Sequence, residues 1–243
     1  MSAVESPWVV RWTRPDEARL RLWCLGRAGT GATPFRPWEE LVGPGVELCA
    51  VRLPGRENRI REAPLASTAA VVEELSPLVA DDAGTPFALF GHCFGALVMF
   101  ELARALRQEG LPSPVALFVG EQVAPAAAGP LGDGELTRDD LLRRLEELGG
   151  TDAKLLGSEE FLALMEPALR ADFRLVGTYA YEPGPPLDTP ISVLADAGRT
   201  ELDPLLAWCA ETTRAFTLRL LRGDDLLVEI GRAVAAELEL VLR

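Results

Sequence analysis

The sequence predicts an α/β fold with a mostly parallel central sheet and helices on both faces, because short apolar runs alternate with helical patterns along the chain. The later runs are rich in Val, Leu, Ile and Phe with little alternation, as expected for strands buried on both faces. The predicted strands are residues 8–12, 20–25, 46–51, 87–90, 115–119, 191–194 and 216–221. The clearest predicted helices are residues 96–106, 202–213 and 226–242.

One segment departs from this alternation. Residues 125–190 contain no convincing strand but three helical stretches, at 137–148, 159–164 and 167–178. Because α/β sheets bind ligands at the carboxyl ends of their strands, a helical insertion of this length predicts a lid over that edge. Extra packing helices without a gating role are the alternative. We therefore expect one domain over residues 1–243, with a helical lid at about 125–190 inserted within it.

Composition excludes several classes of protein. The formal net charge is −13, and the only lysine is Lys154, so the sequence lacks the basic face of a nucleic-acid-binding protein. No run of eighteen apolar residues is long enough to span a membrane, and the N-terminus shows no signal-peptide pattern. These features predict a cytoplasmic protein that contacts neither nucleic acid nor membrane.

The four cysteines are widely separated. They form no Cys-x-x-Cys pair, and with a single histidine in the chain they predict no metal site. Cys24 and Cys49 lie within apolar runs and Cys209 follows Trp208, so we expect these three thiols to be buried and inert. Cys93 differs from these three because it lies in a short segment flanked by glycines.

Cys93 lies at the centre of a Gly-x-Cys-x-Gly motif between Gly91 and Gly95. An apolar strand leads into the motif and a helix follows at once, which is the context of a nucleophile elbow. The glycines leave room for a sharp turn that holds the central residue in strained backbone geometry. Cysteine replaces the usual serine here, and a helix N-terminus is expected to lower the pKa of its thiol.

Several further stretches match a known family in order along the chain. They include a glycine-rich loop in residues 23–32 and a Leu-Pro-Gly-Arg-Glu motif at residues 53–57. Residues 35–38, 46–52, 148–151, 167–176 and 179–190 match as well. With the elbow, this pattern resembles the type II thioesterases of polyketide and nonribosomal peptide assembly lines. The resemblance implies an α/β-hydrolase fold and a substrate carried on the phosphopantetheine of an acyl or peptidyl carrier protein, with no bound cofactor.

The same resemblance implies an oxyanion hole made by two backbone N–H groups, those of Ala28 and Phe94. An ordinary strand-to-helix turn is the alternative role for Ala28. The family usually has a histidine or an aromatic residue one position earlier, where this chain has Arg27. That cation is a candidate contact for a substrate carboxylate or phosphate.

The chain departs from the family at the catalytic base. Its only histidine, His92, precedes the nucleophile and is interpreted as structural, while Asp225 stands where the catalytic histidine is expected. The triad acid is also in doubt. Arg199 occupies its usual place and is, with Arg27, a candidate contact for the substrate. The nearby Asp196 is either that acid or a turn residue, with the turn favoured.

These departures predict a particular chemistry. Exchange of an acyl group between thiols is close to thermoneutral, whereas attack by water needs a strong general base. We therefore expect Cys93 to accept acyl groups and to favour transfer over hydrolysis. Two alternatives remain: a scaffold that binds carrier proteins without catalysis, and non-covalent catalysis with Asp225 as the acid–base group. The candidate surface contacts for an acidic carrier are Arg56, Arg59, Arg61, Arg170 and Arg174, with ordinary solvated surface charge as the favoured alternative for each.

Overall fold

The computed structural model describes residues 6–81, 84–128, 136–148, 158–199 and 201–242. A seven-stranded sheet in the order β1-β3-β2-β4-β5-β6-β7 forms its centre, with β1 antiparallel to β3 and every other neighbouring pair parallel. The strands are β1 Val9–Arg11, β2 Leu20–Leu25, β3 Val46–Val51, β4 Phe87–His92, β5 Leu117–Gly120, β6 Ile191–Asp196 and β7 Phe216–Leu221. All seven predicted strands are present.

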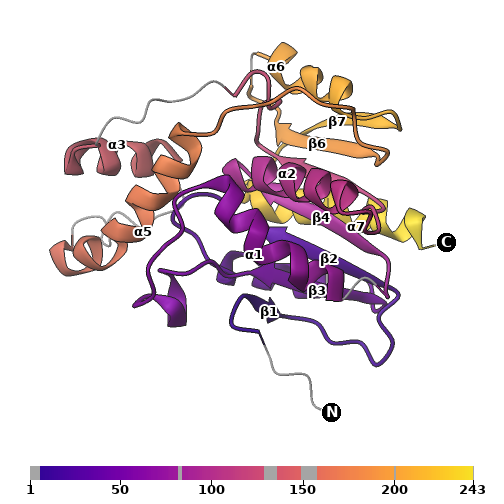
Figure 1. Ribbon diagram of the computed structural model, residues 1–243, viewed down its shortest axis with the longest axis horizontal. Helices are drawn as coiled ribbons and strands as arrows, with labels where there is room; N and C mark the ends of the chain where they lie inside the picture. The colour runs from indigo at the N-terminus through magenta and orange to yellow at the C-terminus, as the bar shows by residue number, and fades with distance from the viewer. Residues whose placement is uncertain (1–5, 82–83, 129–135, 149–157, 200, 243) are drawn as a thin grey trace.

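Helices cover both faces of this sheet. In Figure 1, α1 and α2 lie in front of it and α7 lies behind, while α3 and α5 extend beyond one edge on the left. The α-helices are α1 Thr68–Asp81, α2 Phe94–Gln108, α3 Arg138–Leu148, α5 Glu159–Gly177, α6 Asp203–Leu206 and α7 Leu226–Val241, and the 3-10 helices are η1 Thr33–Glu40, η2 Glu57–Arg59 and η3 Ala207–Glu211. The predicted α/β architecture is thus confirmed.

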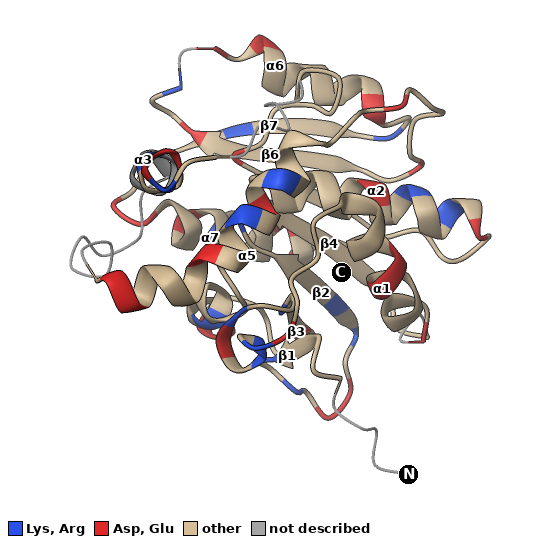
Figure 2. Ribbon diagram, turned by 60° about the vertical axis from the view of Figure 1, so that its left-hand side comes forward, with Lys and Arg blue, Asp and Glu red and all other residues tan. Residues whose placement is uncertain are grey.

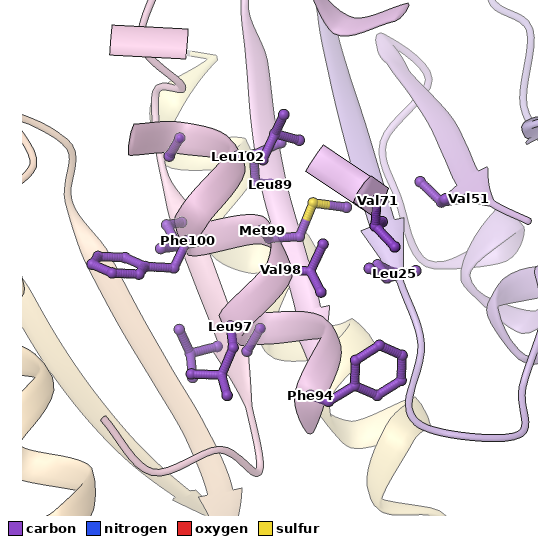
Figure 3. Packing of buried hydrophobic residues seen from close by; sticks show 14 of the residues in the cluster. Leu25, Val51, Val71, Leu89, Phe94, Leu97, Val98, Met99, Phe100 and Leu102 are labelled. Atoms are coloured by element: carbon purple, nitrogen blue, oxygen red, sulfur yellow. The ribbon is translucent and has the colours of Figure 1, made fainter. Parts of the chain in front are cut away.

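Two hydrophobic cores hold these layers together. On one face, Val71 of α1 lies beside Met99 and Val98 of α2, above Leu25 and Leu89 of the sheet (Figure 3). On the other face, Ile230 and Val234 of α7 pack with Phe35, Trp38 and Phe90. Because both faces are covered, the central strands β4 and β5 are apolar along almost their whole length and do not alternate.

The helix predictions need three corrections. The predicted helices at 159–164 and 167–178 are one helix, α5, which runs through Pro167 because Leu169, Phe173 and Leu175 bury its second half. The predicted helix at 202–213 is instead the short α6 followed by η3. Helix α1 was not predicted, although Ser67 at its start and buried Val71, Leu75 and Val79 at four-residue spacing are its sequence signals.

Leu89 and Leu240 offer a matched test of the core. Leu89 of β4 is fully buried, whereas Leu240 near the end of α7 is 64% exposed. We expect Leu89→Ala to lower the free energy of unfolding by about 2–5 kcal/mol because it removes buried contacts and leaves a cavity. Leu240→Ala is expected to change it by less than about 0.5 kcal/mol. Urea unfolding measures both, and equal effects would contradict this description of the core.

Candidate active site

Cys93 has the backbone geometry of a nucleophile elbow. Its φ is 54° and its ψ is −129°, directly before the first residue of α2. A Cβ atom on Gly91 would lie 2.3 Å from the backbone N of Ala96, and one on Gly95 would lie 2.5 Å from the carbonyl O of Leu25. A side chain at either position would collide with the neighbouring backbone, so both residues must be glycine. The predicted sharp turn is confirmed.

The loop after β2 packs directly against this elbow. A Cβ on Gly95 would also lie 2.6 Å from the carbonyl O of Gly26. The loop then forms a tight turn, in which the hydroxyl of Thr30 donates to the carbonyl of Arg27 at 2.7 Å and Gly29 has a φ of 75°. Ala28 is buried inside this turn. The two segments predicted to supply the oxyanion donors are thus neighbours.

The environment of the Cys93 thiol is set mainly by burial. Burial raises the pKa of this thiol, and the charge of Glu121 raises it further. The N–H of Phe94, which donates to the sulfur, and the cations Arg27 and Arg199 lower the pKa without cancelling the effect of burial. The prediction of a lowered thiol pKa is therefore wrong, because loss of hydration outweighs the helix N-terminus. At neutral pH the group is a thiol.

His92 is a weak base because its pKa is lowered. Burial and the neighbouring charge of Arg27 lower the pKa of His92 to about 4, so its imidazole is neutral at pH 7 and a weak proton acceptor. Its ring lies close to the end of β5, where a Cβ on Gly120 would lie 3.3 Å from its Cδ2. This contact agrees with the structural role inferred from the sequence.

Glu121 is a member of the site that the sequence analysis missed. It follows β5 with a φ of 57°, and it lies across from Cys93 because the N–H of Cys93 donates to the carbonyl of Gly120 at 2.8 Å. Its carboxylate accepts the N–H of Asp196 and pairs with Arg199 at 3.0 Å. The sequence signal was a charged residue directly after a buried strand next to β4.

Asp196 and Arg199 reach the same edge of the sheet from the end of β6. The carboxylate of Asp196 accepts the N–H of Gly198, as its predicted turn role expects. Arg199 forms an ion pair with Glu121, and the positive charge of Arg199 lowers the pKa of the Cys93 thiol. The structure thus brings Arg27, Arg199 and Glu121 together around Cys93.

Asp225 has a local structural role. It is the N-cap residue of α7, where its side chain accepts the N–H of Val228 at 3.2 Å. The side chain is exposed, and among the described groups the charges that act on the Cys93 thiol are those of Arg27, Arg199 and Glu121. Its acid–base role stays a prediction.

Two other predictions about exposure are wrong. Cys209 is exposed, because Trp208 occupies the buried side of η3 and turns its neighbour outward. Arg56 and Arg59 are buried and hydrogen-bonded, so they cannot form a surface for a carrier protein. Figure 2 shows basic and acidic residues interspersed along α2 and α5.

The described residues contain neither a metal site nor a membrane-spanning helix. Among them, no group of His, Cys, Asp and Glu is arranged to hold a metal ion, and no helix is long and apolar enough to cross a membrane. A cavity of about 570 Å³ lies between α1, α2 and the end of α5, but Cys93 does not line it. The elbow and this cavity are therefore separate features of the structure.

The parallel sheet and the elbow define an α/β-hydrolase. The chain belongs to the thioesterase family, because the family described as "Thioesterase domain" matches residues 20–231. It is 36% identical to the gramicidin S biosynthesis protein GrsT of Aneurinibacillus migulanus, over 97% of this chain and 95% of that protein.

Solved structures agree with this assignment. The type II thioesterase BorB from the borrelidin biosynthetic cluster superimposes with a TM-score of 0.85 at 31% identity, covering 100% of both chains. YbtT, a type II thioesterase from the yersiniabactin NRPS/PKS biosynthetic pathway, gives a TM-score of 0.82 at 26% identity, with 96% of each chain covered. The α/β-hydrolase fold predicted from the sequence is therefore shown.

The charges around Cys93 predict how its alkylation depends on pH. In a Cys209→Ser background, Arg27→Gln should raise the thiol pKa and move the alkylation profile to higher pH, because a cation that favours the thiolate is lost. Glu121→Gln should move the profile to lower pH. Iodoacetamide labelling followed by mass spectrometry measures both shifts. Arg214→Gln, in an exposed pair with Asp188, is the control, and shifts of the same sign in both site variants would refute this electrostatic description.

Proposed function

We propose that this protein acts on acyl or aminoacyl thioesters carried by the phosphopantetheine of carrier proteins in polyketide or nonribosomal peptide biosynthesis. Cys93 accepts the acyl group, and transfer to a second thiol is favoured over hydrolysis. The observation that carries the proposal is the elbow at Cys93, whose strained backbone presents a nucleophile at the start of α2. The similarity to GrsT, BorB and YbtT supports the carrier-bound substrate.

The proposed acylation step balances without a strong base. The Cys93 sulfur bonds to the thioester carbonyl carbon, and the bond from that carbon to the phosphopantetheine sulfur breaks. The thiol proton of Cys93 passes to the departing sulfur, so one thiol and one thioester are exchanged for another such pair. The raised pKa of the Cys93 thiol is compatible with this step, since the proton is needed by the leaving group.

Hydrolysis of the acyl-enzyme needs a stronger general base than exchange between thiols does. Water must lose a proton as it attacks the acyl-enzyme, and the only histidine in the chain is neutral at pH 7 because its pKa is lowered to about 4. Within the described part of the chain, Glu121 is the carboxylate whose charge acts on Cys93, and it is already bonded to Arg199 and the N–H of Asp196. Acyl groups are therefore expected to remain on Cys93 until a thiol removes them.

The backbone N–H groups of Ala28 and Phe94 are the proposed oxyanion donors. Phe94 begins α2, and Ala28 lies in the turn that packs on the elbow. Arg27, whose charge acts on Cys93, is the proposed contact for an anionic part of the substrate. Loss of either N–H donor would remove stabilisation where negative charge develops.

One observation favours a different function. A partly buried thiol with a raised pKa is what a non-catalytic relative would have, and such a protein would bind a carrier protein without covalent chemistry. In a variant of this alternative, Asp225 transfers protons to or from a bound intermediate. Both alternatives predict that no acyl group is found on Cys93.

Acyl transfer can be followed directly by intact-protein mass spectrometry. After incubation with an acylated carrier protein, the wild type should gain the mass of the acyl group, and Cys93→Ala should not. A second, unacylated carrier protein should remove the adduct, while water should release it about 10²–10⁴-fold more slowly than in an enzyme with a full general base. A folded wild type that never forms the adduct, or that hydrolyses it rapidly, would sink the proposal.

The role of Asp225 can be separated from its capping function. Asp225→Ala should lower the free energy of unfolding by about 1 kcal/mol because the N-cap is lost, whereas Asp225→Ser keeps a capping oxygen and should not. We expect Asp225→Ser to form the Cys93 adduct at the wild-type rate. Thermal melts and adduct formation measure the two properties, and slower acylation in Asp225→Ser would assign Asp225 an acid–base role.

A further inference from the structure

A buried carboxylate on the insertion helix α5 lies outside the chemistry described so far. Asp172 is 0% exposed, and it forms an ion pair with Arg56, which is 2% exposed. The second oxygen of this carboxylate accepts the backbone N–H of Gly29 at 2.7 Å. A charge placed at zero exposure is retained only where its partners satisfy it, and here the partners come from two other segments of the chain.

The Gly29 N–H belongs to the turn beside the nucleophile. Gly29 directly follows Ala28, the proposed oxyanion donor, and its φ of 75° turns the chain at this point. The preceding Gly26 packs on Gly95 of the elbow. A hydrogen bond to Gly29 therefore fixes the orientation of the peptide next to the proposed donor, in a turn that packs on the helix headed by Cys93.

A second carboxylate holds the far end of the same loop. One oxygen of Glu57 accepts both the N–H of Thr33, at 2.9 Å, and its hydroxyl, at 2.7 Å. Arg56 and Glu57 are consecutive, and Glu57 has a φ of 50°. Arg56 thus acts on this loop through Asp172, and Glu57 bonds to it directly.

We propose that Asp172, neutralised by Arg56, is a positioning residue that holds the 26–30 turn so that the N–H of Ala28 faces the site of oxyanion formation beside Cys93. This inference rests on the proposed function for the identity of the donor. Because Asp172 belongs to α5, the insertion helix has to be seated on the loop for the donor to be in place. The insertion is thereby part of the catalytic geometry.

Two reactions of Cys93 separate this role from a structural one. Acylation by S-acetyl-pantetheine passes through an oxyanion, whereas alkylation by iodoacetamide displaces iodide at carbon and forms none. In a Cys209→Ser background, Asp172→Asn should slow acylation by about 10–100-fold, since small misplacements of a donor carry costs of this size. Alkylation should stay near the wild-type rate, because the described charges that act on the thiol belong to Arg27, Arg199 and Glu121.

Amide hydrogen exchange gives a readout that does not depend on activity. In Asp172→Asn, peptides covering residues 26–33 should exchange faster while those covering β4 do not change. Arg56→Lys keeps the positive charge but loses the planar guanidinium, so residues 26–33 should exchange faster than in the wild type but more slowly than in Asp172→Asn. If Asp172→Asn fails to fold, Arg56→Lys serves as the test. Glu166→Gln, which breaks a partly exposed pair with Arg170 on the same helix, is the control.

The combined results decide whether Asp172 is a positioning residue. Slower acylation with unchanged alkylation and faster exchange at 26–33 supports the positioning role. Wild-type acylation in a folded Asp172→Asn protein, or a parallel loss of acylation, alkylation and melting temperature, overturns it. A wild-type protein that forms no acyl adduct would sink the proposed function instead, and the exchange of residues 26–33 would still show whether Asp172 orders the turn.

Discussion

The left-handed backbone of Cys93 is the constraint on which the rest of the site depends. A non-glycine residue with this geometry costs about 1–3 kcal/mol and persists only where its surroundings impose it. Here β4 is held in the middle of the sheet, and α2 starts one residue later with its apolar face in the core. Gly91 and Gly95 allow the backbones to approach closely enough for the strand and helix to meet at Cys93.

The parallel register then determines what surrounds the sulfur. Because β2, β4, β5 and β6 are parallel neighbours, their carboxyl ends meet at one edge and bring Arg27, Cys93, Glu121 and Arg199 together. The charges oppose one another, since two cations lower the thiol pKa and one carboxylate raises it. Burial outweighs both, so the pKa of the Cys93 thiol lies above its ordinary value and the resting group is a protonated thiol.

The insertion between β5 and β6 is joined to this edge by polar contacts as well as by apolar packing. A buried ion pair contributes little net stability, but it fixes geometry because removing one partner leaves an unpaired charge. The pair of Asp172 and Arg56 has this character, and it connects α5 to the loop after β2. Arg56 and Glu57 of the Leu-Pro-Gly-Arg-Glu motif thus contact α5 and the loop after β2, respectively.

The sequence by itself determined the strands, the elbow and the family, because these depend on local patterns: apolar runs, paired glycines and a motif of five residues. It also showed that no histidine is available outside the elbow. Only the tertiary structure decided which charges act on Cys93, Glu121 among them, that Arg56 is buried, and that Asp172 contacts the loop after β2. Burial and contacts between distant segments depend on how the chain packs, and local sequence patterns do not specify that packing.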